Sequence, residues 1–511
     1  MAESQVRTLL LVCALMLMTS CMVKPTVLTT DEVQDRVTAD REILSHDYEP
    51  ITRPINLYEA MARALRYNLD AKVKAMQAAL AHQQLNVSNY ALLPQLAANA
   101  GYDGRNNFSA SAGRSLVTGR QLLEPFTSLD KNIFTGNLAL SWDILDFGLS
   151  YVRAKQAGDN MLIAEEEKRR IAVRLLQEVR SAYWRSVSAE RLLPQIQALD
   201  SMVGKALSQA QVIYDKKLQT PLSPLNYRRD MLNIQREVQK LYRELVTAKF
   251  QLASLMGLPP GSQFQVEQLS SQETDPIVNL NIEVLEKQAL VFRPELRTID
   301  YQKRINAREA KATLLELFPS MKLQFGGYYN SNSFLLYQNW LNYAAQISWN
   351  LLGVFRVPAK YKAVEAHAKV LEAQSMALTM TIVTEIHVGA AQFLLAKDEL
   401  NNAKQYRETQ HAITEHTKNL WLTNSTNDLT LMREKMNHIL AEARLDVAQA
   451  GTESAYATLR AAVGEEAVPP AIEGQDIAAL TDAVRRLWEP TTSTGISQTE
   501  KEEAHASLVA R

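Results

Sequence analysis

The chain has 511 residues, and its 55 lysines and arginines against 56 aspartates and glutamates give a formal net charge of −1. That balance provides no overall basic field for capturing phosphates, so it argues against a nucleic-acid partner. Hydrophobic residues make up 46% of the chain, typical of a folded protein, yet no internal stretch approaches the roughly 20 apolar residues of a membrane-spanning helix, which excludes a helical transporter. Only 18 glycines and 17 prolines interrupt it, which favours long elements.

The N-terminus resembles an export signal. Apolar residues 9–18 are typical of the central region of a signal peptide, which is predicted over 1–20. The run ends in Thr19-Ser20-Cys21, which is similar to a lipobox, so Cys21 is the predicted lipidation (palmitate) site at the start of a segment over 21–56. The alternative is an ordinary signal peptide with an incidental cysteine. No cysteine follows Cys21, so the mature chain does not depend on disulfides.

The rest of the chain contains an internal duplication. Ser-Trp-Asp around Trp142 recurs as Ser-Trp-Asn around Trp349, 207 positions later (349 − 142), whereas Pro94 and Pro319 differ by 225 (319 − 94). The first half therefore carries an insertion of 18 residues (225 − 207), which we place in the Gly- and Ser-rich stretch 104–131. The predicted organisation is a first repeat over 57–257, a linker over 258–283, a second repeat over 284–464, and a C-terminal segment over 465–511 with a polar, disordered tail.

Each repeat begins with a helical period of about 35 residues that ends at its proline. A strand hairpin follows, then a very long helix rich in strong helix formers, a short turn and a return helix of about 36 residues. The long helices are predicted from about Ser150 to Lys217 and from about Pro358 to Leu422. Each would be on the order of 100 Å long.

The strand hairpins, over 93–147 and 318–352, alternate apolar and polar residues. Strands of about ten residues with one apolar face and aromatic residues near their ends are typical of a membrane β-barrel, although an ordinary half-buried hairpin is the alternative. Because four strands cannot close a barrel and an open edge inside lipid leaves backbone groups unpaired, a barrel requires oligomerisation. The candidate lipid-facing residues are Leu138, Leu140, Trp142, Ile347 and Trp349.

The ordered set of features resembles the TolC-like outer-membrane factor family (outer membrane efflux proteins), in its lipoprotein-bearing members. The set comprises the duplicated halves, the helix-to-proline junctions, the run Arg293-Pro294-Glu295-Leu296 and the paired Ser-Trp motif. The resemblance implies an α+β membrane protein that forms a homotrimer, with a twelve-stranded transmembrane β-barrel in outer-membrane lipid and a long α-helical tunnel through the periplasm. It also implies docking to a periplasmic adaptor protein and an inner-membrane pump, and an equatorial region built from 259–281, the chain after Gly464 and residues 22–56.

The helix turns far from the strands are the candidate periplasmic entrance and adaptor contact. Family members often carry glycine where these helices end, whereas Lys217 and Asn424 stand there in this chain. Asp428, repeated around a symmetry axis, would form an ion-selective ring. The alternative is that Asp428 and Asn427 cap the return helix. The residues of these turns are Thr220, Pro221, Leu222, Ser223, Asn424, Ser425, Thr426, Asn427 and Asp428.

The predicted function is that of an outer-membrane exit duct of a tripartite efflux or type I secretion system. Conduction would be passive, because the sequence contains no phosphate-binding loop. The alternative is a lipid-anchored periplasmic coiled-coil scaffold without a channel. No enzyme, cofactor or metal site is predicted, since no catalytic constellation is present and His411 and His416 lie off a common helix face.

Overall fold

The computed structural model divides into two compact units, Met1–Pro50 and Ile51–Arg511. It describes residues 26–46, 48–121, 124–216, 222–259, 261–267, 281–464, 469 and 476–488. The described part of the first unit contains helix α2 (Thr30–His46). A capping box begins this helix: the Glu32 N–H donates to Thr29 Oγ1 (3.3 Å) and the Thr29 N–H donates to the Glu32 carboxylate (2.8 Å). The predicted signal peptide and Cys21 lie outside the described residues.

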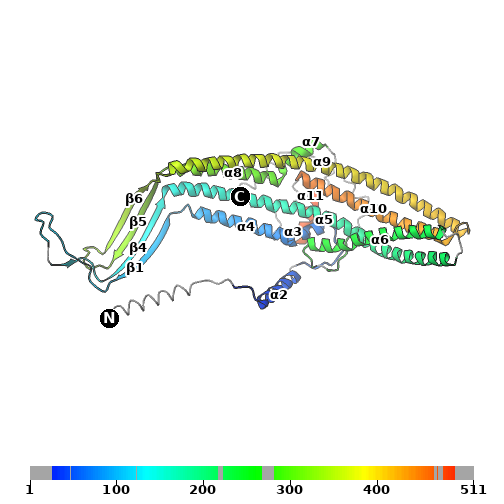
Figure 1. Ribbon diagram of the computed structural model, residues 1–511, viewed down its shortest axis with the longest axis horizontal. Coiled ribbons are helices and arrows are strands. Elements are labelled where there is room, and N and C mark those ends of the chain that lie inside the picture. Colours follow the sequence, from blue (N-terminus) through cyan, green and yellow to red (C-terminus); the bar gives the residue numbers. More distant parts are fainter. Residues whose placement is uncertain are drawn as a thin grey trace. The chain divides into compact units, whose positions relative to one another are not determined.

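The second unit joins an antiparallel sheet to a layer of long helices (Figure 1). Its strands are β1 (Gln95–Gly104), β2 (Ala110–Ser111), β3 (Phe126–Thr127), β4 (Asn132–Asp143), β5 (Ser320–Asn330) and β6 (Asn339–Ser348). Its helices are α3 (Leu57–Tyr67), α4 (Leu69–Tyr90), α5 (Ile144–Asp215), α6 (Leu222–Leu255), α7 (Ile282–Phe292), α8 (Pro294–Leu315), α9 (Gly353–Leu422), α10 (Asp428–Val463) and α11 (Ile477–Trp488). The sheet order is β1-β4-β5-β6, and the helices that continue these strands contact one another in the matching order α4-α5-α8-α9.

Each repeat opens with two helices rather than the single helix of about 35 residues that the periodicity predicts. The first break is at Asn68, whose backbone is extended and whose side chain accepts from the N–H groups of Asp70 and Ala71 at the start of α4. The second is at Arg293, which is also extended because it precedes Pro294. An amide cap and a proline therefore interrupt the two halves at corresponding positions.

The long helices begin earlier than predicted. α5 starts at Ile144, where the Asp143 carboxylate accepts from the Asp146 N–H (3.0 Å), and α9 starts at Gly353. Pro358 consequently lies inside α9 rather than at its start. With 72 and 70 residues, the two helices are each on the order of 100 Å long, as expected.

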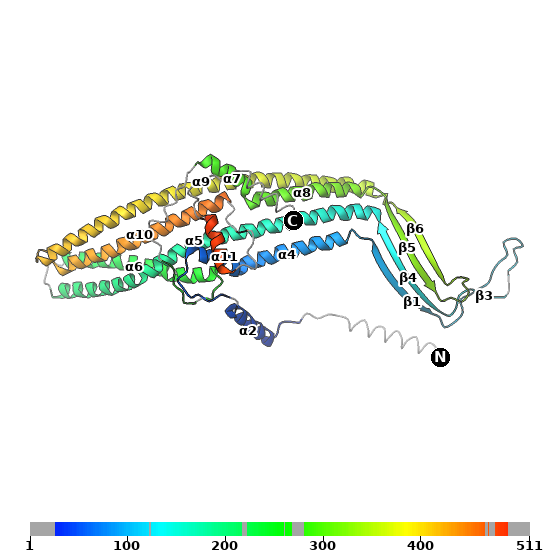
Figure 2. The same cartoon turned by 180° about the vertical axis from the view of Figure 1, so that it is seen from behind.

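Helix α5 holds the second unit together, because it contacts α4, α6, α8 and α10 (Figure 2). Away from the sheet, its buried residues Leu192, Leu199 and Val203 pack against Met231 of α6 and Met436 of α10. Burial of a large aliphatic side chain contributes about 1.5–3 kcal/mol. This apolar cluster therefore fixes the return helices against the long helix.

An ion pair is buried between α5 and α10. The Arg180 guanidinium lies 2.6 Å from the Glu453 carboxylate, and both side chains are less than a tenth exposed. The guanidinium also lies over the rings of Tyr456 and Trp488, at 5.0 and 5.6 Å from their centroids. Trp488 belongs to α11, so this arginine of α5 contacts both α10 and α11.

Within the second unit, described residues of the segments that the resemblance assigns to an equatorial region lie against α5 and α3. Ile55 forms a parallel bridge with Val266, and the buried Tyr183 hydroxyl of α5 donates to the carbonyls of Ile55 and Glu267. Burial raises the pKa of Tyr183, so this hydroxyl stays protonated and remains a donor. α11 covers the apolar face of α3.

One stretch of α9 is more apolar than the sequence analysis expects. Within the described residues, α9 contains an 18-residue window of mean hydropathy 1.4, which by length and composition alone could cross a membrane. Only 28% of that window is buried. α9 nevertheless contacts α7, α8 and α10, and its Ile382 and Ile386 pack against Ala289 and Ala462. The expectation that no internal stretch is sufficiently apolar is therefore wrong by this measure.

Removal of one partner of the buried ion pair should destabilise the helical layer. We expect Glu453→Ala to lower the free energy of unfolding by about 3–5 kcal/mol, because it leaves a buried guanidinium unpaired. Replacing both partners, as in Arg180→Met with Glu453→Met, should cost less than the single change. Denaturant unfolding followed by helical circular dichroism measures both, and a single variant that unfolds like the parent would contradict the assigned role of the pair.

Candidate functional site

The register of the sheet gives it one apolar and one polar face. Directly opposed residues of antiparallel strands share a face, so each row of paired residues can be assigned to one side. Except at the strand ends, one face consists of apolar side chains, tyrosines and glycines. Its members are Leu96, Ala98, Ala100, Tyr102, Gly104, Asn132, Phe134, Gly136, Leu138, Leu140, Trp142, Met321, Leu323, Phe325, Gly327, Tyr329, Asn339, Leu341, Tyr343, Ala345 and Ile347.

The apolar face is open to solvent in the single chain. Leu140 is 41% exposed, Leu138 54% and Ile347 71%. These three residues and Trp142 lie on this face, where the alternation predicts them. Trp349 lies beyond the end of β6, and its indole N–H donates to the Leu317 carbonyl (3.0 Å). A contiguous apolar surface of this extent marks a site for contact with lipid or protein.

The opposite face carries amides, hydroxyls and a few charges. Asn137 and Gln346 lie on it, as predicted, and so do Asp143 and Lys322 on neighbouring strands. Two aromatic residues, Tyr328 and Trp340, also lie on this face, although the sequence analysis did not single them out. Such a face suits contact with water.

The connection between β1 and β4 is longer than the connection between β5 and β6. It contains the short β2–β3 hairpin, in the stretch where the sequence predicts the insertion. Asn332, in the shorter connection, is 3% exposed; its side chain accepts from the Asp130 N–H and donates to the Ser128 carbonyl. The longer connection is therefore held at its base by the shorter one.

The α9–α10 turn is built by capping interactions. Asn424 has a φ of 55°, in the left-handed region that asparagine tolerates better than most residues. The Asn427 side chain caps α10 by accepting from the Thr430 N–H (2.8 Å) and hydroxyl (2.9 Å). Asp428 is exposed, and its carboxylate accepts from the Trp421 indole N–H. The capping role falls to Asn427, so the Asp428 carboxylate does not close the helix.

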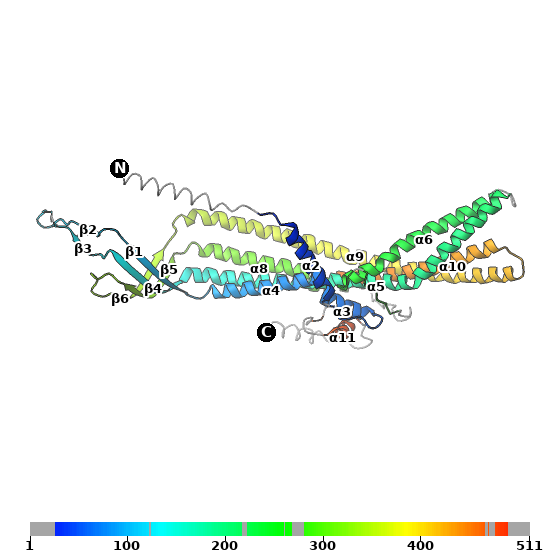
Figure 3. The same ribbon diagram turned by 90° about the horizontal axis from the view of Figure 1, so that it is seen from below.

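The α5–α6 turn is described in part. Leu222 and Ser223 begin α6 and are exposed, whereas Thr220 and Pro221 lie outside the described residues. Figure 3 shows that the α5–α6 pair and the α9–α10 pair separate toward their turns. The structure therefore places the candidate entrance residues in two groups rather than one cluster within a single chain.

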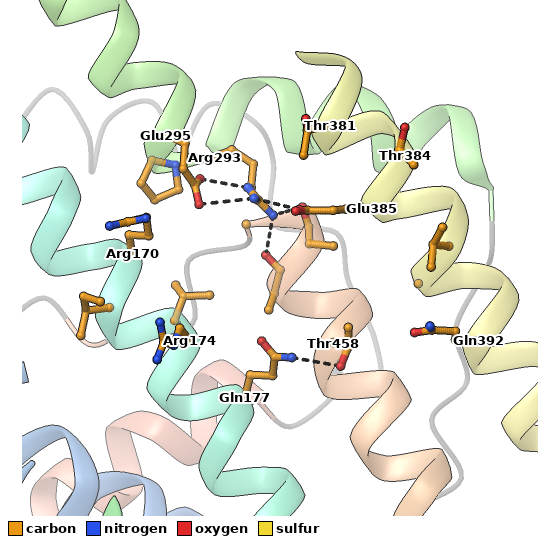
Figure 4. A pocket seen from close by; sticks show the side chains of 18 of the residues that line it. Arg170, Arg174, Gln177, Arg293, Glu295, Thr381, Thr384, Glu385, Gln392 and Thr458 are labelled. Carbon is orange, nitrogen blue, oxygen red and sulfur yellow. Dashed lines mark hydrogen bonds and ion pairs between the residues drawn. The ribbon is translucent and has the colours of Figure 1, made fainter. Parts of the chain in front are cut away.

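A cavity of about 660 Å³ lies where α8 and α10 meet end to end, between α5 and α9 (Figure 4). Arg293 points into this junction, where it pairs with Glu295 (3.0 Å) and Glu385 (2.9 Å). It also donates to the Ala462 carbonyl (3.1 Å) at the C-terminus of α10, which a positive charge stabilises. The arginine thus fastens three helices together, and the carboxylates offset its charge.

Two histidines approach each other where α9 packs on α10, away from the sheet. The His411 ring lies 5.2 Å from the His438 ring across the α9–α10 contact, rather than near His416. In the described part of the chain, no group of three or more histidines, cysteines, aspartates and glutamates is placed to hold a metal ion.

Helix α4 carries an apolar stripe that no described residue of its own unit covers. Its members follow the spacing of four and three residues that places side chains on one helix face in a coiled coil, interrupted once by the polar Gln83. They are Leu69, Val73, Met76, Leu80, Val87 and Tyr90, each more than half exposed. Because α4 is the first helix of the layer α4-α5-α8-α9, the stripe is available to another chain.

No protein-family model matches the sequence, and the comparison with curated proteins gives no match. Solved structures do match. The chain is similar to the outer-membrane channel OprN, with 16% identity and a TM-score of 0.60 over 80% of this chain and 89% of that one. It is similar to the open MtrE outer membrane channel of Neisseria gonorrhoeae (16%, 0.61, 80% and 88%) and to the CmeC outer membrane channel of Campylobacter jejuni (14%, 0.59, 91% and 98%). The chain therefore has the fold of the TolC-like outer-membrane channels, as the sequence resemblance implies.

The cap assignment at the distal turn can be tested with adjacent residues. We expect Asn427→Ala to lower stability by about 0.5–2 kcal/mol, because two donors at the start of α10 lose their acceptor. Asp428→Ala removes an exposed carboxylate and its hydrogen bond from the Trp421 indole but leaves the cap of α10 in place, so it should lower stability less. Thermal unfolding of the two variants makes the comparison, and a larger loss for Asp428→Ala would contradict the assignment of the cap.

Proposed function

We propose that this chain is a bacterial outer-membrane channel that serves as the passive exit duct of a tripartite efflux or type I secretion system. The observation that carries the proposal is the two-faced sheet with two open edges. Within the described residues, β1 and β6 each pair with one neighbouring strand. Successive rows of opposed residues alternate between an apolar and a polar face of the sheet. A lipid-facing exterior and a water-filled interior require this pattern.

The size of the interior supports three as the smallest number of copies that leaves an open channel. Each chain supplies four strands to the sheet. Two copies would form eight strands, an interior that side chains fill, whereas three copies form twelve strands and leave room for solute. The exposed stripe on α4 supports the same assembly, because a neighbouring chain can cover it. The working form is then a homotrimer.

The channel would act with a periplasmic adaptor protein and an inner-membrane pump that supplies the energy for transport. The helices extend on the order of 100 Å from the sheet, so their turns reach deep into the periplasm. We assign Leu222, Ser223 and the turn 424–428, together with Thr220 and Pro221, to the entrance and to contact with a periplasmic adaptor protein. An inner-membrane pump would supply the work, and Asp428, exposed on each copy, would favour cations at the entrance.

Lipidation at Cys21 is part of the proposal and rests on the sequence alone. A lipid at this residue would anchor the mature chain to the outer membrane in addition to the sheet. Mass spectrometry of the exported protein tests it: an identical mature N-terminus in the parent and in Cys21→Ala would refute lipidation without affecting the channel.

The competing proposal is a lipid-anchored coiled-coil scaffold that does not cross the membrane. A scaffold needs the long helices and the stripe on α4 but has no use for an apolar sheet face. Single-channel recording with purified protein in a planar bilayer separates the two. Discrete conductance steps support the duct, whereas a protein that binds the bilayer without conducting favours the scaffold.

Closure by three copies should be visible in crosslinking. Ala97→Cys on β1 and Ala344→Cys on β6 place thiols on the two edge strands, about 16 Å apart within one chain, too far for a short crosslinker. In the doubly substituted protein, crosslinks between chains should give a ladder that stops at three. Either single variant should give no ladder. A ladder that continues past three, or ends at two, would contradict the trimer.

Tolerance of charge should follow the faces of the sheet. Leu138→Arg places a cation on the apolar face in the middle of β4, at a cost of about 2–4 kcal/mol near the bilayer midplane, so assembled protein in the membrane should fall sharply. Asn137→Arg, one residue earlier on the same strand, points to the polar face and should assemble. The measurement is the yield of membrane-extracted oligomer. Equal yields for the two variants would show that the apolar face does not meet lipid.

A further inference from the structure

One row of the polar face crosses all four strands and combines amides with aromatic rings. Asn99 pairs with Asn137, Asn137 with Tyr328, and Tyr328 with Trp340. Opposed side chains on one face of an antiparallel pair have Cβ atoms about 5 Å apart. These four side chains therefore form a continuous band across the sheet, which we call the amide–aromatic band.

The two rings of the band are arranged for stacking. The Tyr328 and Trp340 rings are nearly parallel, with an angle of 12° between their planes and 5.9 Å between their centroids. Trp340 is 42% exposed. Parallel, offset rings are a favourable arrangement that a further aromatic ring can extend.

Small residues leave space beside the rings. The neighbouring row on the helix side of the band contains Ala97, Ala139, Gly326 and Asn342. A Cβ at Gly326 would lie 2.6 Å from the Leu138 carbonyl oxygen, so close strand packing requires glycine there. The rings thus lie beside a row of small side chains on the polar face, and this row ends at Asn342 on β6.

The amide–aromatic band is uncharged, and one of its amide oxygens has no hydrogen-bond donor. No residue of the two rows is charged. The Asn137 Oδ1 atom is buried and accepts no hydrogen bond. A buried carbonyl oxygen without a donor is unfavourable, so a turn of the Asn137 side chain that brings its oxygen to a ligand N–H or O–H is favoured.

We propose that the amide–aromatic band is a binding site for neutral aromatic solutes that carry a hydrogen-bond donor, such as phenols and indoles. The ligand ring would stack on Tyr328 or Trp340, and its donor would pair with Asn137. The inference rests on the proposed function, because only in a closed barrel does the polar face line the lumen. Three copies then give three equivalent sites on the wall of the duct, each of which retains an aromatic solute briefly as it leaves.

The test uses the full chain in detergent and measures binding of resorcinol by saturation-transfer NMR. Cyclohexane-1,3-diol, with the same donors and no aromatic face, is the matched probe. We expect resorcinol to bind more tightly than the diol. Trp340→Leu and Tyr328→Leu should each weaken resorcinol binding by roughly two- to tenfold, and Trp340→Phe should restore most of the loss. Tyr343→Leu, which removes an exposed ring from the apolar face, should leave binding unchanged.

Three results would overturn the inference. Equal binding of resorcinol and the diol would remove the role of stacking. An equal effect of Tyr343→Leu and Trp340→Leu would show that the probe binds exposed rings in general. Tighter binding of maltose than of resorcinol would reassign the band to carbohydrate. Conductance of the parent protein is recorded separately, so a protein that conducts without binding resorcinol refutes this inference alone, whereas one that never conducts refutes the proposed function.

Discussion

The outer edges of β1 and β6 present backbone N–H and C=O groups that a sheet of four strands leaves without partners. Inside a bilayer no water reaches such groups, and each would cost several kcal/mol. If the apolar face meets lipid, the edges must be joined, and another copy of the same sheet has the matching length and pattern. Oligomerisation is then a condition for the sheet to enter the membrane, and the apolar stripe on α4 extends the contact between copies into the helices.

The helical part needs contacts that fix the position of each long helix along its neighbours. Apolar packing alone permits helices to slide, because many small steps bury similar areas. Along α5, charged side chains remove that freedom: Asp159 pairs with Arg304 and Arg308 of α8, and Arg180 pairs with Glu453 of α10. Each pair satisfies its charges only at one relative position of the helices. Arg293 does the same where α8 meets α10, so the junction holds its alignment without a continuous helix.

The first helices of the two repeats differ in how far they are buried. α3 and α7 have bounds that differ by 225 positions (282 − 57), the same offset as the paired prolines. α3 is nearly all buried, with even Glu59 and Arg63 inside, because α11 covers it. α7 has one buried residue in the described structure, Ala289, and packs on α9 and α10. Among the described residues, equivalent helices are thus covered in one half and exposed in the other.

The sequence by itself determined the kinds of element and their faces. Strong helix formers predict α5 and α9, the change to a period of two predicts the strands, and that period assigns Leu140 and Ile347 to one side. Alternation assigns a residue to a face but not to a neighbour, so only the tertiary structure decided that Asn137 meets Tyr328 and that Tyr328 meets Trp340. The helix breaks and the buried ion pairs were likewise decided by tertiary contacts, since a local period records neither a cap nor a charge nearly 300 residues away. Register between distant strands and helices is set by which groups satisfy one another in three dimensions, and a linear pattern does not contain that information.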